Sequence, residues 1–138
     1  MTFLLDTNVI SEPTKKSPSA QVVAWLANRS PDEVFFSAVT LAEVRYGIQA
    51  APAGARKQAL EIWFDETFVG RPERIIPIGF DIADAWGRLR RRTEGARRSM
   101  DAIDAFIAAT AEVHGLTLVS RNTRHFEAWG GPVLNPWP

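Results

Sequence analysis

The sequence predicts an α/β fold built on a buried, mainly parallel sheet. Short apolar runs alternate along the chain with longer stretches whose apolar residues recur at helical spacing. The runs are almost continuously apolar, which is typical of parallel strands covered by helices on both faces. Pro77 lies in the third run and favours an edge position for it, because proline cannot donate a ladder hydrogen bond. We expect strands at 3–5, 34–37, 74–78 and 116–119, and a short last strand at 132–134.

Capping residues and glycines delimit the helices between these runs. Apolar spacing predicts a helix over 20–28. Thr40, followed three residues later by Glu43, forms a capping-box pattern that predicts a helix over 41–49. Gly115 is expected to end the helix before the fourth strand. The other expected helices cover 55–68, a stretch from Asp81 into an arginine run, and a stretch from a cap at Ser99 or Asp101 to His114.

Composition narrows the class of protein. The chain has 138 residues, of which 46% are hydrophobic, and we expect one domain over 1–138. The absence of cysteine excludes disulfides, thiolate metal sites and a cysteine nucleophile. The 16 basic and 16 acidic residues cancel, so the distribution of charge is more informative than its sum. The first residues do not form a signal peptide, and no stretch approaches the ~20 apolar residues of a membrane span, so we expect a cytoplasmic protein.

Acidic residues lie near the expected carboxyl ends of the strands, where ligands bind in open parallel sheets. Asp6 ends the first strand, Glu43 follows the second, and Asp104 begins the helix before the fourth. Three such carboxylates at one edge would repel one another unless a cation neutralises them. Oxygen ligands without cysteine favour Mg²⁺ or Mn²⁺ over Zn²⁺. The pattern therefore predicts metal-assisted phosphoryl chemistry.

Several segments, in order and spread over nearly the whole chain, carry recognisable motifs: FLLDTNVISE at 3–12, FFSAVTLAEVRYGI at 35–48, DAFIAATAEVHGLTLVSRNTRHF at 104–126 and VLNPWP at 133–138. Together they resemble the PIN-domain ribonucleases, and most of all the toxin subunits of VapBC-type toxin–antitoxin modules, including the FitB-like branch. The resemblance implies a three-layer α/β/α sandwich and a Mg²⁺- or Mn²⁺-dependent endoribonuclease. It also implies a cognate antitoxin protein as inhibitor and a toxin homodimer.

The same resemblance assigns roles to individual residues. Asp6, Glu43 and Asp104 match the acidic positions that hold the metal and serve catalysis. Many relatives have a fourth acidic residue after the last central strand, where this chain has Asn122. Because an amide adds no negative charge, we expect one tightly bound ion and a second bound only weakly or only with substrate. The polar residues that match supporting positions are Thr7, Asn8, Ser37 and Ser120.

Some residues have a second interpretation. Glu43 could complete a capping box with Thr40 instead of holding a metal. His125 is expected to be a surface loop residue rather than a general base. Several arginines form either a solvated surface or a set of contacts to RNA phosphates: Arg90, Arg91, Arg92, Arg97, Arg98 and Arg121.

Two other functions compete with the nuclease. Haloacid-dehalogenase-like phosphatases also use an aspartate at a strand end with Mg²⁺, but they need a second aspartate two residues later, where this chain has Asn8. A PIN-like domain that has lost its acids can serve as a binding scaffold. The presence of all three main acids disfavours that interpretation.

Overall fold

The computed structural model describes all 138 residues, and at its centre lies a five-stranded sheet in which every paired neighbour is parallel. The strands, in spatial order, are β3 (Ile75–Ile76), β2 (Val34–Ser37), β1 (Phe3–Leu5), β4 (Thr117–Val119) and β5 (Val133–Leu134). The predicted α/β class is therefore confirmed. β3 lies at an edge, as Pro77 suggested, although it is shorter than the predicted strand over 74–78.

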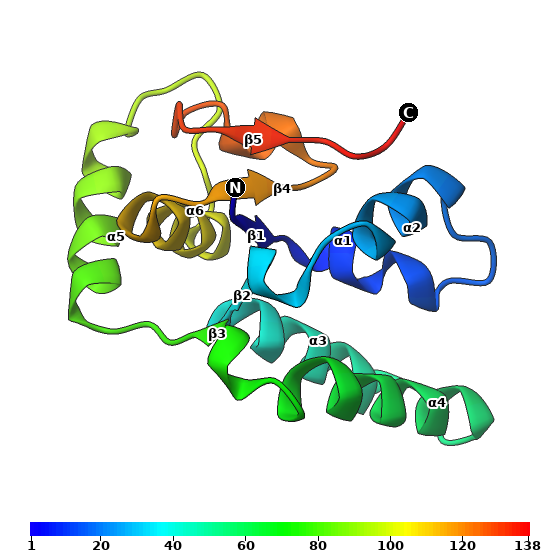
Figure 1. Ribbon diagram of the computed structural model, residues 1–138. Helices are drawn as coiled ribbons and strands as arrows, with labels where there is room; N and C mark the ends of the chain where they lie inside the picture. Colours follow the sequence, from blue (N-terminus) through cyan, green and yellow to red (C-terminus); the bar gives the residue numbers. More distant parts are fainter.

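Helices cover both faces of the sheet, as the sandwich prediction requires (Figure 1). They are α1 (Thr7–Ser11), α2 (Ala20–Ala27), α3 (Ala38–Ala50), α4 (Ala55–Phe64), α5 (Phe80–Arg92) and α6 (Ala102–His114). A π-helical turn over Asp65–Val69 continues α4, so the predicted helix over 55–68 is correct in extent but changes its hydrogen-bonding pattern near its end. None of the helices is long and apolar enough to cross a bilayer.

The core consists of two apolar clusters, one on each face of the sheet. Leu4 packs with α5 and α6 on one face, whereas Phe3 and Leu5 pack with α1 to α4 on the other. Side chains alternate between faces along a strand, so three consecutive apolar residues serve both clusters. This is why β1 is a continuous apolar run in the sequence.

Two local predictions near the site were wrong or incomplete. Helix α3 begins at Ala38, and Ser37 caps it by accepting a hydrogen bond from the Val39 N–H at 3.1 Å. Thr40 therefore lies inside the helix, fully buried, and the capping-box interpretation of Glu43 is wrong. The short helix α1 was not predicted at all, because Asp6, Thr7 and Asn8 suggested a turn.

The register of the sheet places the polar residues that follow β1 and β4 side by side at one edge. Leu5 pairs with Val119, and the Asp6 N–H donates to the Val119 carbonyl at 2.9 Å. Asp6 and Ser120 thus follow neighbouring strands at the same level. Helix α6 also packs against α3, so residues from both helices can reach this edge.

Candidate active site

Asp6 forms the centre of the candidate site and is only 7% exposed. Its Oδ2 accepts hydrogen bonds from Ser120 Oγ at 2.7 Å and from Asn8 Nδ2 at 3.3 Å, while Oδ1 accepts from the Thr7 N–H at 2.8 Å. Burial raises the pKa of Asp6 above 3.8, and these hydrogen bonds act in the opposite direction. The carboxylate is therefore held in one orientation in an environment that disfavours its charge.

Asn8 and Ser120 fix this orientation by joining the ends of β1 and β4. The Asn8 amide donates to Ser120 Oγ at 3.3 Å and accepts from the Arg121 N–H at 3.1 Å. Ser120 Oγ also accepts from the Asn122 N–H at 3.0 Å. Both ends of the Asn8 amide are thus occupied by structural contacts, which leaves it no part in proton transfer.

Glu43 lies in the second turn of α3 and is connected to the site by a hydrogen bond from Thr7. Thr7 Oγ1 donates to Glu43 Oε1 at 2.9 Å. Burial raises the pKa of Glu43, and the charges of Asp6 and Asp101 raise it further. The effect of Asp6 on Glu43 shows that the first and second strand ends bring their carboxylates into one electrostatic environment.

Asp104 lies in the first turn of α6 with a side chain that is 16% exposed. Its pKa rises to about 6, chiefly because it is buried and then because of the charges of Asp101 and Asp6. His125 Nδ1 lies 3.3 Å from Asp104 Oδ2 and is the one neighbour that lowers this pKa. Asp101 itself caps α6 by accepting from the Asp104 N–H at 2.8 Å.

The donor set suits a hard divalent cation. Three carboxylates with raised pKa values share one edge of the sheet, and every nearby side-chain ligand other than His125 offers oxygen or an amide. No three acidic or histidine side chains converge into a finished ligand set in this conformation. Burial is the largest cause of the raised pKa values, and neighbouring carboxylates add to it at Glu43 and Asp104, so a cation of the magnesium type would offset the negative charge gathered at this edge.

Of the other predicted residues, Ser37 supports a helix of the site, whereas Asn122 and Arg121 lie in the exposed loop after β4. Ser37 is fully buried and caps α3, so its hydroxyl supports the helix that carries Glu43. Asn122 is exposed in the loop after β4, and its backbone N–H is bound to Ser120. Arg121 lies over the Trp137 ring, 5.3 Å from its centroid.

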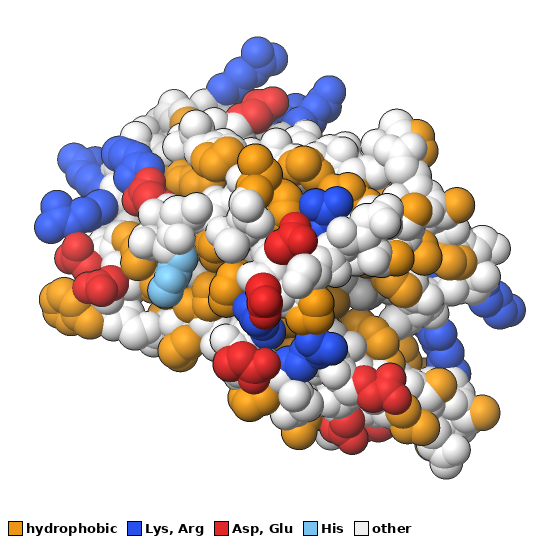
Figure 2. Space-filling model, in the orientation of Figure 1, with side chains coloured by type: hydrophobic (Ala, Val, Ile, Leu, Met, Phe, Trp, Pro, Cys, Tyr) orange, Lys and Arg blue, Asp and Glu red, His pale blue; other side chains and the backbone are white.

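The arginines on α5 are mostly neutralised. Arg88, Arg91 and Arg92 form ion pairs with Asp84, Glu94 and Glu112 respectively. Arg90 lies over the Trp86 ring, 5.2 Å from its centroid. The solvated-surface interpretation thus fits the α5 arginines, which Figure 2 shows at the left edge of the molecule.

Sequence reasoning missed His125 as a neighbour of the acidic cluster. It lies in a 3₁₀ turn (Thr123–Phe126) after β4, close to the strand end that carries Ser120. The signal that could have found it was this position, because the same rule that selected Asp6 applies to every residue after a central strand.

Comparisons with known proteins agree with the fold and the motifs. The model of the PIN domain family matches residues 3–130, and the chain belongs to this family. The chain is 38% identical to the toxin FitB of Neisseria gonorrhoeae over 98% of both chains. It is 35% identical to the VapC ribonuclease Y4jK of Sinorhizobium fredii, over 98% of this chain and 97% of the relative. A structure of FitAB bound to a DNA fragment superposes with a TM-score of 0.93 at 36% identity, covering 99% of this chain and 96% of the other. The predicted kinship with VapBC-type toxins is therefore confirmed.

Proposed function

We propose that this chain is a divalent-metal-dependent endoribonuclease and the toxin of a type II toxin–antitoxin pair. The observation that carries the proposal is the set of three carboxylates with raised pKa values, from the end of β1, from α3 and from α6, in which the charge of Asp6 raises the pKa of both Glu43 and Asp104. Relatives with the names VapC ribonuclease and tRNA(fMet)-specific endonuclease support the nuclease class. Neither the phosphatase nor the scaffold alternative is favoured. We propose the cytoplasm as its site of action, because that is where an RNA substrate would be met.

Asp6, Glu43 and Asp104 would hold the ion, which we propose to be Mg²⁺ or Mn²⁺. Ribonucleases of this family generally depend on a divalent metal. Such an ion supplies Lewis-acid chemistry, favouring deprotonation of the attacking water and offsetting negative charge on the phosphodiester. Asn122 stands at the fourth position without adding charge, so we propose one tight site and a second, weak one.

The remaining residues of the site position these carboxylates. Ser120 and Asn8 keep Asp6 from rotating, and Thr7 orients Glu43. His125 lies beside Asp104 and provides a neighbouring positive charge when it is protonated. No side chain of the site is arranged as a nucleophile with a base, which fits in-line hydrolysis by water and products with a 5′-phosphate and a 3′-hydroxyl.

A cognate antitoxin would bind a different face. A groove of about 310 Å³ lies between α2 and the π-helical turn after α4, and its lining includes Leu26, Trp63 and the arginines Arg29 and Arg71. Apolar and arginine side chains together are typical of protein interfaces. Structural neighbours include a toxin–antitoxin complex from Klebsiella pneumoniae, and we propose that this chain also forms such a complex, with a toxin homodimer at its centre.

The test is cleavage of labelled RNA by the antitoxin-free protein with Mg²⁺, with EDTA, and with Asp104→Asn in place of the wild type. We expect cleavage only with Mg²⁺ and only by the wild type. Asp65→Asn is the matched control, since Asp65 is exposed at the start of the π-helical turn after α4 and belongs to no part of the candidate site. Cleavage in EDTA, or products that end in a 2′,3′-cyclic phosphate, would contradict the proposal.

A further inference from the structure

A second polar groove adjoins the acidic cluster on the α6 side. It has a volume of about 380 Å³ and no hydrophobic side chain in its lining. Asp101 and Asp104 are part of its lining. Its other charged side chains come from the loop between α5 and α6 and from the turn after β4: Arg97, Arg98, Arg124 and His125. We call it the arginine groove.

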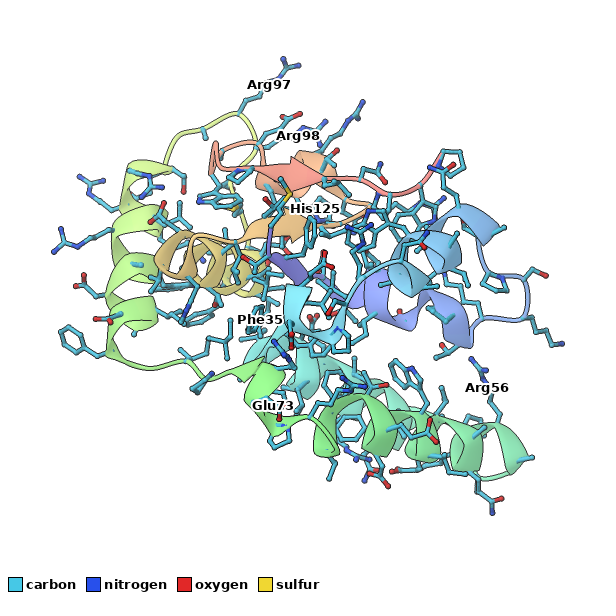
Figure 3. The ribbon with its side chains drawn as sticks, viewed as in Figure 1. Phe35, Arg56, Glu73, Arg97, Arg98 and His125 are labelled. Atoms are coloured by element: carbon cyan, nitrogen blue, oxygen red, sulfur yellow. The ribbon has the colours of Figure 1, made fainter.

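The arginines of this groove differ from Arg88, Arg91 and Arg92 of α5 in having no acidic partner. Three arginines of α5 are held in ion pairs, whereas Arg97, Arg98 and Arg124 form no salt bridge with any carboxylate. Figure 3 shows Arg97 extending away from the body of the molecule on the loop after α5, with Arg98 on the same loop. A cluster of exposed, unpaired guanidinium groups creates a local positive potential that the zero net charge of the chain conceals.

The two carboxylates in the groove do not cancel this potential. Asp101 is engaged in capping α6, and Asp104 belongs to the set that would hold the cation. With that cation in place, the charges that remain unmatched next to the site are those of the arginines. Guanidinium groups bind phosphate oxygens through paired N–H donors.

We propose that the arginine groove binds a phosphate of the RNA strand next to the phosphate that is cut, with Arg98 and Arg124 as the principal donors and Arg97 at the rim. This inference rests on the proposed ribonuclease function and specifies where the strand continues beyond Asp104. RNA is a better occupant than a protein because the groove has no apolar wall on which a protein side chain could anchor.

The test measures binding rather than cleavage. The probe is a fluorescent single-stranded RNA of about 12 nucleotides and mixed sequence, which suffices because phosphate contacts dominate non-specific affinity. All variants are made in an Asp6→Asn background and measured in Mg²⁺, so that a cation is available while the loss of one of the three carboxylates keeps the RNA intact. Asp6 does not line the arginine groove, and every variant shares this background, so differences between variants report on the arginines.

Arg98→Gln/Arg124→Gln should weaken RNA binding by about tenfold. It should also reduce the slope of log K against log salt by about 0.7 for each phosphate that the protein no longer neutralises. Arg56→Gln/Arg88→Gln is the matched control. It removes the same charge from α4 and α5, outside the groove, and should change neither quantity beyond the general charge effect. Arg56 lies on the far side of the molecule from the groove residues in Figure 3.

The outcomes separate the two proposals. Equal affinities and equal salt slopes for the two double variants would overturn the groove while leaving metal-dependent cleavage intact. Weaker RNA binding only in the groove variant would support the groove even if the wild type failed to cleave. Equal RNA binding together with a weakened complex with the purified antitoxin would assign the groove to the protein partner and overturn its assignment to RNA.

Discussion

Replacing Asp104 with asparagine should stabilise the metal-free protein while removing its activity. The Asp104 carboxyl has a pKa of about 6 in the folded protein, against 3.8 for an unperturbed aspartate. A shift of about 2 units at about 1.36 kcal/mol each corresponds to ~3 kcal/mol. Because water still reaches part of the side chain, we reduce this to about 1–2 kcal/mol at pH 8.

The sign of the effect depends on pH. The folded-state pKa is raised, so Asp104 contributes full stability below about pH 4, and this contribution is lost as the pH rises through about 6. The advantage of Asp104→Asn should therefore be largest at about pH 8, fall by roughly half at about pH 5, and vanish below the unfolded pKa.

Urea unfolding of the two proteins in EDTA, at about pH 8 and about pH 5, measures this difference in the free energy of unfolding. Asp65→Asn serves as control and should change the free energy of unfolding by no more than about 0.5 kcal/mol, because the Asp65 side chain is exposed and lies outside the candidate site. Saturating Mg²⁺ should narrow or reverse the stability difference between Asp104→Asn and the wild type. Only the wild type keeps all three carboxylates, so it should bind the ion more tightly and gain more stability from it. A destabilised Asp104→Asn at pH 8, or an equal gain at both pH values, would refute the reasoning.

Two further predictions concern packing around the site. Thr40 is fully buried and its hydroxyl has no partner, whereas that of Thr110 donates to a carbonyl one helical turn back at 2.7 Å. Thr40→Val should thus be neutral or stabilising by up to about 1 kcal/mol and Thr110→Val destabilising by about 1 kcal/mol in urea unfolding, and the reverse order would contradict this assignment. A Cβ on Gly131 would lie 2.2 Å from the Trp129 ring, so Gly131→Ala should cost about 1–3 kcal/mol. Gly47→Ala, whose Cβ meets nothing within 4 Å, should not lower stability. Thermal unfolding of both variants measures the difference, and an equal loss of stability in the two would contradict the clash at Gly131.

The fold was largely predictable because its signals are local. The apolar runs located β1, β2 and β4, and the rule that ligands bind beyond the carboxyl ends of strands selected Asp6. Helix starts were less predictable, since Ser37 and Thr40 are both good caps and only the end of β2 decides between them. A five-residue helix such as α1 has too few apolar positions to show a period.

The internal contacts of the site were not predictable in the same way. The Asn8 amide and the Ser120 hydroxyl are 112 residues apart, and the contact depends on the register between β1 and β4. His125 approaches Asp104 only because the turn after β4 folds back toward α6. Sequence patterns indicate which residues reach an edge of the sheet, whereas the pairing of their side chains is set by tertiary packing.

Zero net charge is compatible with RNA binding when opposite charges are used in different places. Three arginines of α5 are neutralised at short range by acids of α5, of the loop after it and of α6, which leaves that surface without a strong field. Beside the candidate metal site, three carboxylates have raised pKa values and three arginines form no ion pair. A divalent cation satisfies the first group and a phosphodiester strand satisfies the second. An RNA with its scissile phosphate at the ion and the next phosphate in the arginine groove would satisfy both at once, which neither a free nucleotide nor a metal alone can do.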